Sequence, residues 1–308
     1  MIICNIFVQQ FAPLFLQFAL FVAQKSVDNN CEIWYSRIMK CDLHMHSTFS
    51  DGIFSPEKLV EMAKEKELDC ISVTDHDTVD GVFRAQQKAK SLGIVCLTGM
   101  EISTLSNGKE VHILAYNLDT AAHGFADEMK TISNFRLERN KQMQQKFDEH
   151  GIDIDILSLK SDGSIGRGEI AREMVKRGIC ADSSEAFEKY LGVGKLCYVQ
   201  TRRLTPVEAI QFTLRFGGIP VLAHPKQLHM SYREFEKFLH PLVLAGLGGI
   251  EAQYFAHNNV ERKFFGRMAK KYHLVVTGGS DFHDYTHGVT LGQQSFSPNA
   301  FTEKVLGL

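Results

Sequence analysis

The segment DLHMHSTFSDG at residues 42–52 decides the fold class of this chain, because it shows the pattern that the other predicted strands repeat. A short apolar run ends there in two histidines and a polar turn. Apolar runs of this kind recur along the chain and are separated by amphipathic stretches. They occupy residues 40–43, 70–74, 93–97, 110–116, 218–223, 249–254 and 274–277. Near-continuous apolar runs are typical of strands buried on both faces of a parallel sheet. Strands that alternate with helices form right-handed βαβ units, so seven of them predict an α/β barrel or near-barrel.

Helices are expected between these strands. Ser55, Pro56 and Glu57 form a strong helix start, since serine caps the first turn, proline fits the first position and an acid faces the positive helix end. Amphipathic periodicity predicts further helices at residues 84–92, 206–216, 232–244 and 260–272.

The alternation of strands and helices breaks in the middle of the chain. Residues 126–150 predict one long helix, and residues 168–178 and 183–191 predict shorter ones, with no buried strand among them. The predicted organisation is a barrel built from residues 39–118 and 206–308 that is interrupted by a helical insertion at residues 119–205.

Charge and cysteine content limit the classes of partner. The net charge of −2 gives no global positive field for non-specific nucleic-acid binding, and we expect no recognition of DNA sequence. A small nucleotide or short RNA can still be held by a few local arginines. The seven cysteines are widely spread without a C-x-x-C pair, which suits a reducing compartment and favours a cytoplasmic location.

The N-terminal 38 residues do not fit the pattern of the rest of the chain. Residues 2–23 are apolar, but no lysine or arginine precedes them, and Gln9, Gln10, Pro13 and Gln17 interrupt the run. The segment is either signal-like or anchor-like, or translation begins at Met39. We treat residues 1–38 as an extension outside the fold, and we expect no membrane association if the chain begins at Met39.

Metal-competent side chains follow the predicted strands. Each has an ordinary alternative when taken singly, such as a surface histidine, a helix cap or a solvated acid. The ends of barrel strands converge on one face, however, so these residues are expected to meet. The candidate ligands are His44, His46, Asp51, His76, Glu101, His112, His224, Asp281 and His283.

This ligand set predicts a chemistry. Histidines and carboxylates without cysteine favour manganese, iron or zinc, and nine ligands exceed the demand of one ion, so two or three divalent ions are expected. Clustered ions activate water and neutralise a phosphoryl group during in-line displacement. The residues therefore predict a metal-dependent phosphoesterase.

Six motifs in this order and spacing resemble those of the PHP (polymerase and histidinol phosphatase) superfamily. They are DLHMHSTFSDG (42–52), TDHDT (74–78), GMEIS (99–103), VHIL (111–114), VLAHP (221–225) and GGSDFH (278–283). The resemblance implies a distorted (β/α)7 barrel with a trinuclear site, with manganese as the first expectation and iron or zinc as alternatives. It also implies three ligand sets, which are His44, His46, Glu101 and Asp281; Asp51, His76, Glu101 and His224; and His112 with His283.

The insertion resembles that of the branch containing RNase AM and the 3′,5′-nucleoside bisphosphate phosphatases. In this resemblance Arg136, Arg139 and Arg167 correspond to substrate-binding arginines, and Arg167 also to a catalytic one. His257 matches a family position and is expected to contact phosphate or to protonate the leaving group. Glu169 stands where the branch usually has histidine, which implies either a substituted metal ligand or an altered substrate.

The branch implies hydrolysis of nucleotide phosphate esters. The expected reactions are conversion of a 3′,5′-nucleoside bisphosphate such as adenosine 3′,5′-bisphosphate to AMP, 5′–3′ exonucleolytic trimming of short RNA, or both. Two alternatives stay open, a histidinol-phosphate phosphatase and a non-catalytic PHP module.

Overall fold

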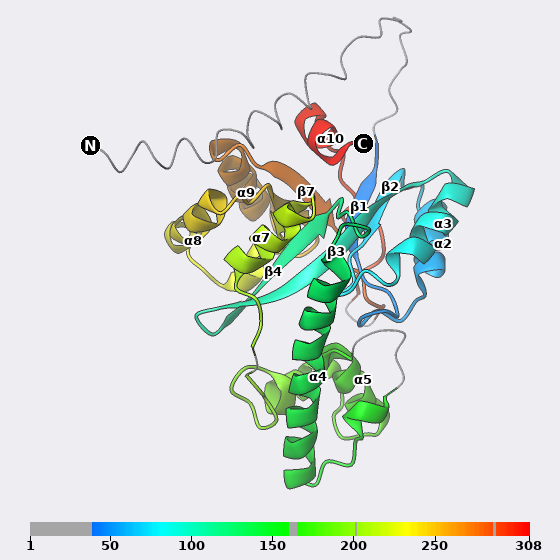
Figure 1. Ribbon diagram of the computed structural model, residues 1–308, viewed down its shortest axis with the longest axis vertical. Coiled ribbons are helices and arrows are strands. Elements are labelled where there is room, and N and C mark those ends of the chain that lie inside the picture. The colour runs from blue at the N-terminus through cyan, green and yellow to red at the C-terminus, as the bar shows by residue number, and fades with distance from the viewer. Residues whose placement is uncertain (1–38, 160–164, 201, 286–287) are drawn as a thin grey trace, which may run out of the picture. The chain divides into compact units, whose positions relative to one another are not determined.

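The computed structural model describes residues 39–159, 165–200, 202–285 and 288–308 (Figure 1). The predicted extension at residues 1–38 therefore lies outside the described residues. No helix in the described ranges combines the length and the apolar character that crossing a bilayer requires.

Seven strands and nine α-helices make up the described chain. The strands are β1 (Cys41–Met45), β2 (Cys70–Val73), β3 (Val95–Ser106), β4 (Lys109–Tyr116), β5 (Ile219–Leu222), β6 (Gly249–Tyr254) and β7 (Val275–Gly279). The helices are α2 (Pro56–Glu65), α3 (Val82–Leu92), α4 (Phe125–Glu149), α5 (Arg167–Lys176), α6 (Ser183–Ala186), α7 (Pro206–Arg215), α8 (Tyr232–Leu244), α9 (Asn259–Lys271) and α10 (Ala300–Leu306). Short helical turns are η1 (Ile156–Ser158), η2 (Phe187–Leu191) and η3 (Pro225–Leu228).

The strands form one sheet in chain order from β1 to β7, which confirms the predicted seven-stranded α/β fold. The first and last strands approach each other as well, because Met45 bridges Phe282 and the Asp281 amide donates to the His44 carbonyl at 2.8 Å. The sheet is thus a nearly closed, distorted barrel. The first motif, at residues 42–52, and the last motif, at residues 278–283, meet at the seam between β1 and β7.

The expectation of purely parallel strands is wrong for β4. The run predicted at residues 93–97 continues as β3 to Ser106 and returns through Asn107 and Gly108 into β4, which pairs antiparallel with both β3 and β5. Asn107 and Gly108 have φ of 49° and 77°, as a two-residue hairpin turn requires, and Asn-Gly is a strong sequence signal for such a turn. As a consequence Glu101 lies inside a strand, opposite Leu114, rather than after its end.

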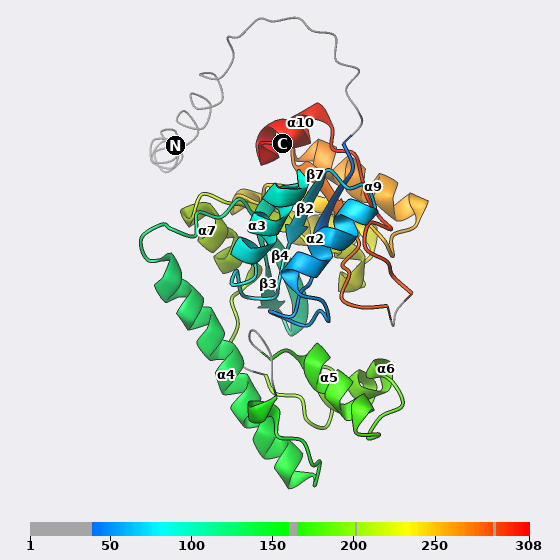
Figure 2. The ribbon, with the colours of Figure 1, turned by 90° about the vertical axis from the view of Figure 1, so that its right-hand side faces the viewer.

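Helices cover the sheet as their apolar faces dictate. Ser55 caps α2 by accepting a hydrogen bond from the Lys58 amide at 3.3 Å, with Pro56 at the first position, so the predicted helix start is confirmed. Leu59 and Val60 of α2 belong to the same buried cluster as Ile71 of β2. The helices α7, α8 and α9 supply a second buried cluster with β4 and β6. Figure 2 shows α2 and α3 in front of the sheet in that view.

The helices between β4 and α7 have a core of their own. Met143 and Phe147 of α4 are buried together with Ile170 and Met174 of α5. The stretch predicted as one helix at residues 183–191 is α6 followed by the π-helical turn η2. We propose the limits 119–205 for this insertion, because the second half of α4 forms a buried cluster with α5 and α6 that is separate from those of the sheet, while Phe125 and Ile132 of α4 pack with the sheet.

The chain returns from the insertion along β3. Leu204 bridges Thr104 in parallel orientation, and the Leu105 amide donates to the Leu204 carbonyl at 3.0 Å. Residues just before Leu204 are thereby fixed next to the strand that carries Glu101.

The barrel seam tolerates no side chain at Gly279. A Cβ there would lie 2.4 Å from the His44 Cβ and 2.6 Å from its backbone nitrogen. Gly279→Ala is therefore expected to lower the free energy of unfolding by about 1–3 kcal/mol, because β7 must move away from β1. Chemical denaturation measures this change. Gly266→Ala in α9 is the matched control, since a Cβ there meets nothing within 4 Å; equal stability of the two variants would contradict the close approach.

Candidate active site

The carboxylate of Glu101 lies at the centre of a histidine cluster and is 1% exposed. Its Oε2 atom is 3.3 Å from the Nε2 atoms of both His44 and His46, and 3.2 Å from Nδ1 of His76. These imidazoles come from β1, from the residue that follows it and from the loop after β2, so the contact joins segments far apart in the sequence.

The other oxygen of Glu101 faces a second pair of imidazoles. Its Oε1 atom lies 3.0 Å from Nδ1 of His112 on β4 and 2.9 Å from Nε2 of His224, which follows β5. The two oxygens of one carboxylate thus address two different groups of ligands, as a bridging ligand between two ions does.

The remaining predicted ligands complete the cluster. Asp281 Oδ1 lies 3.2 Å from Nε2 of both His44 and His46. Asp51 Oδ1 lies 3.2 Å from Nε2 of His283. All nine predicted ligands therefore lie in one connected site. Three groups have ligand atoms close enough to share an ion, namely His44, His46, Glu101 and Asp281; His46, Asp51, His76 and His283; and His76, Glu101 and His112.

The grouping differs in part from the sets that the resemblance implied. The structure brings the four side chains of the first set together. His283, which was expected to share an ion with His112, lies instead with Asp51 and His76. His112 lies beside His224, because both contact the same oxygen of Glu101.

Unpartnered polar atoms show that the site fits divalent ions. His44 Nε2, His46 Nε2, Asp51 Oδ1 and Asp281 Oδ1 are buried and make no hydrogen bond in the described chain, although each lies within ion-pair distance of an opposite charge. Buried polar atoms without hydrogen bonds are costly and rare. These nitrogen and oxygen atoms converge without hydrogen bonds between them, and a metal ion bound there would satisfy all of them.

Electrostatics keep the carboxylates of the site ionised, and the same carboxylates raise the pKa values of His44, His112 and His283. Burial would raise the pKa of Glu101, but the imidazoles of His44 and His112 hold it well below its usual range. The pKa of Asp281 is likewise held low by His44 against the effect of burial. Burial lowers the pKa of His76 to about 3, which leaves a neutral imidazole.

Strand β6 supplies no predicted ligand but orients three of them. Glu251 is fully buried and accepts hydrogen bonds from His44 Nδ1 at 2.9 Å and from the His224 amide at 2.7 Å. Tyr254 donates to Asp281 Oδ2 at 3.0 Å, which leaves Oδ1 facing His44 and His46 as a candidate metal ligand. A carboxylate on Nδ1 directs the lone pair of Nε2 toward the ion. Sequence reasoning missed both residues; the signal for Glu251 was an acid in an otherwise apolar run.

The backbone is strained at or directly beside three of the candidate metal ligands. Asp77, His224 and Asp281 have positive φ values of 56°, 25° and 51° without being glycine. Such conformations cost energy and concentrate at functional sites.

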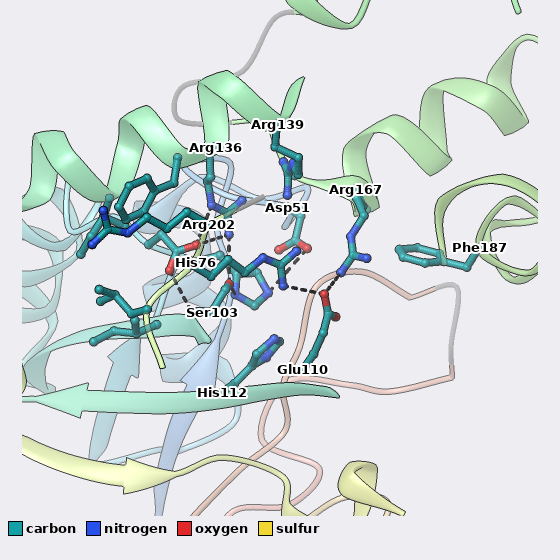
Figure 3. A pocket seen from close by; sticks show the side chains of 18 residues that line it. Asp51, His76, Ser103, Glu110, His112, Arg136, Arg139, Arg167, Phe187 and Arg202 are labelled. Atoms are coloured by element: carbon teal, nitrogen blue, oxygen red, sulfur yellow. Dashed lines mark hydrogen bonds and ion pairs between the residues drawn. The ribbon is translucent and has the colours of Figure 1, made fainter. Parts of the chain in front are cut away.

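A cavity of about 190 Å³ adjoins the three groups of candidate metal ligands, which we call the metal groups (Figure 3). Asp51, His76 and His112 form one side of it. Its other walls carry five arginines, which are Arg136, Arg139, Arg167, Arg202 and Arg203. Three of these were predicted from the sequence, whereas Arg202 and Arg203 were missed; two adjacent arginines at the end of the insertion were the available signal.

Most of these arginines are held by partners. Arg136 donates from Nε to Asp77 Oδ2 at 2.6 Å. Arg167 and Arg203 both donate to Oε1 of Glu110, the latter at 2.5 Å. Figure 3 shows Arg167 and Glu110 facing each other across one end of the cavity.

Two predicted residues do not line this cavity. His257 is 2% exposed, with Nδ1 3.1 Å from the Ala252 carbonyl and its ring packed against Phe265. Glu169 accepts a hydrogen bond from the Gly166 amide at 2.5 Å and so caps α5. The geometry thus gives His257 no contact with the cavity and gives Glu169 a local structural partner.

Comparisons with known proteins agree with this geometry. The PHP domain family model matches residues 42–193. A 5′-3′ exoribonuclease from Haemophilus influenzae is 32% identical over 256 residues, which are 82% of this chain and 93% of that protein. A 3′,5′-nucleoside bisphosphate phosphatase from Chromobacterium violaceum is 32% identical over 79% of this chain and 86% of its own length. The solved structure of an amidohydrolase from the same organism, with bound sulfate, matches with a TM-score of 0.77 and 29% identity over 85% of this chain and 92% of that one.

Glu251→Gln is expected to weaken metal binding about 10- to 100-fold, because the amide no longer offers His44 the same acceptor. Titration of chelator-treated protein with manganese, followed by metal analysis, measures the affinity. Glu236→Gln is the matched control, since Glu236 is exposed and pairs with Lys271. If the Glu251→Gln variant bound manganese as tightly as wild-type protein, Glu251 would not have the orienting role.

Proposed function

We propose a substrate class for this chain, which belongs to the PHP domain family and is a metal-dependent hydrolase of phosphate esters. Its substrates are nucleotides, either a 3′,5′-nucleoside bisphosphate that is converted to a 5′-monophosphate or a short RNA trimmed from its 5′ end. The observation that carries the proposal is the arginine-lined cavity that adjoins the metal groups. The names of two relatives that match most of this chain, an exoribonuclease and a bisphosphate phosphatase, support the same class.

The contacts favour three ligand sets for two or three ions, with manganese as the first candidate and iron or zinc as alternatives. The first set is the close group of His44, His46, Glu101 and Asp281. The second is Glu101, His112 and His224, which the contacts of Glu101 Oε1 join, and the third is Asp51, His76 and His283, to which His46 also lies close. The manganese preference and a cytoplasmic location stay proposals from the sequence.

Ions held by these ligand sets would supply an activated water and neutralise charge on the phosphoryl group. The chain's own residues do the rest. Arg136, held by Asp77 and by Ser103 Oγ at 3.2 Å, presents a fixed fork beside His76, where it binds phosphate oxygens and stabilises charge that develops on them. His257 stays a predicted proton donor for the leaving group.

The two alternative functions have weaker support. Histidinol phosphate carries a cationic amine, which a cavity lined by five arginines repels. A non-catalytic module has no need for nine ligand-competent side chains in one connected site.

The decisive experiment is product analysis of adenosine 3′,5′-bisphosphate incubated with manganese-loaded protein. The expected products are phosphate and AMP, and 5′-phosphorylated RNA oligonucleotides are tested next. Absence of turnover with metal bound, together with hydrolysis of histidinol phosphate, would overturn the proposed substrate class.

Glu101→Gln is expected to lower turnover at least about a hundredfold, because the two oxygens of this one carboxylate belong to two ligand groups. Ions that bind only the folded chain raise its Tm, so chelation lowers the Tm of wild-type protein. The same variant is expected to lose most of this shift. Thermal unfolding with and without chelator measures it, and a wild-type shift in the variant would contradict the central position of Glu101.

A further inference from the structure

The candidate ligand Asp51 lies where the barrel meets the insertion. It follows β1 in the loop that leads to α2, and its Oδ1 atom is 3.2 Å from Nε2 of His283. Its Oδ2 atom is 3.8 Å from Nε2 of His76. Helix α5 of the insertion contacts the same residue. Asp51 is therefore a point at which the insertion touches the third ligand set.

Two residues of α5 reach Asp51. Arg172 donates from Nη1 to the Asp51 carbonyl at 2.6 Å. The backbone of Gly168 packs so closely that a Cβ there would lie 2.9 Å from Asp51 Oδ2 and 3.3 Å from Asp51 Cβ. Positions four residues apart lie on the same face of a helix, so one face of α5 covers both the backbone and the carboxylate of this ligand.

Another face of α5 is fixed in the core of the insertion. Ile170, Ala171 and Met174 are fully buried there, in a cluster that includes residues of α4. Movement of α5 relative to α4 would expose this apolar surface and is therefore costly. The position of the insertion as a whole is thereby transmitted to Asp51.

The barrel shapes the backbone that leads to Asp51. The Gly52 amide donates to the Ser47 carbonyl at 3.0 Å, and the Ser47 amide donates to Asp75 Oδ1 at 2.7 Å. Asp51 Oδ1 itself is buried and makes no hydrogen bond in the described chain. The contacts from α5 thus add a constraint on Asp51 itself to the constraint that the barrel places on the turn.

We propose that α5 completes the third ligand set, with Arg172 as the residue that positions Asp51 to bind its ion. This inference rests on the proposed function and its ligand sets. An ion that binds Asp51 more tightly when α5 is docked must favour the docked position of α5 by the same free energy. Because α5 begins with Arg167, which lines the cavity, loading of this ion and assembly of the cavity are coupled.

Stepwise metal binding tests the positioning role. Calorimetric titration of chelator-treated full-length protein with manganese resolves the binding of successive ions. Arg172→Met is expected to raise the Kd of one ion about tenfold or more, as the loss of a contact that orients a ligand does, and to leave the other ions unchanged. Arg172→Lys keeps a donor for the Asp51 carbonyl and is expected to recover part of that affinity. Wild-type affinity for every ion in Arg172→Met, or equal weakening of all of them, would overturn the positioning role.

Hydrogen exchange tests the reverse direction of the coupling. In wild-type protein, manganese is expected to slow amide exchange in residues 167–176, and this slowing is expected to be lost in Arg172→Met. Equal exchange with and without manganese in wild-type protein would contradict the coupling.

A matched control removes the same charge from the end of the same helix. Arg177 is 40% exposed and pairs with Glu173 within α5. Arg177→Met is therefore expected to keep both the wild-type manganese affinities and the slowing of exchange. Loss of the slowing in this variant as well would attribute it to the stability of α5 and overturn the assignment to Arg172.

The outcomes separate this coupling from the proposed function. Selective weakening of one ion in Arg172→Met, without phosphate release from adenosine 3′,5′-bisphosphate by wild-type protein, would overturn the proposed substrate class and leave the coupling intact. Phosphate release by wild-type protein, with unchanged manganese binding in Arg172→Met, would overturn the coupling and leave the substrate class intact.

Discussion

The contact of one buried carboxylate with five imidazoles organises the whole site. Glu101 reaches His44, His46 and His76 with one oxygen and His112 and His224 with the other. A group in this position must lie inside the barrel mouth rather than on a loop above it. The long strand β3 meets that requirement, because it continues past Glu101 into the hairpin with β4. The antiparallel distortion of the barrel and the geometry of the site are therefore one feature.

Buried carboxylates beyond the ligands hold the strand ends in place. Asp42 accepts hydrogen bonds from the Ser280 amide at 2.9 Å and hydroxyl at 2.7 Å, which ties β1 to the segment that carries Asp281. Asp75 accepts from the Ser47 amide at 2.7 Å and from the Ser50 hydroxyl at 2.7 Å, which shapes the turn before Asp51. Glu251 does the same for His44 and His224. The ligands are thus positioned by buried hydrogen bonds between strands, which resist displacement because unbonded partners would be costly.

The insertion contributes charge where the barrel contributes metal ligands. Arg136 and Arg139 come from α4 and Arg167 from α5, while Arg203 lies on the returning chain. Like charges do not gather in a buried space without compensation, and the shared use of Glu110 shows how little compensation this chain supplies. The junction between barrel and insertion is consequently suited to a multiply charged anion and unsuited to a cationic substrate.

The sequence by itself determined the strand count, most of the helices but not α10, and all nine ligand-competent residues, because apolar periodicity and the spacing of histidines and acids are local patterns. It did not determine the direction of β4, since an apolar run reads the same in parallel and antiparallel strands and only the turn at Asn107 and Gly108 distinguishes them. It also missed Glu110, Arg203 and Glu251. The local signals, an acid in an apolar run for Glu251 and two adjacent arginines for Arg203, do not name a partner, and the contacts of these residues span 57, 93 and 207 residues in sequence. Tertiary structure alone decided which oxygen of Glu101 meets which histidine, that His283 sits with Asp51, and that Arg139 donates to the Ile165 carbonyl, because each of these depends on contacts formed only when the chain folds.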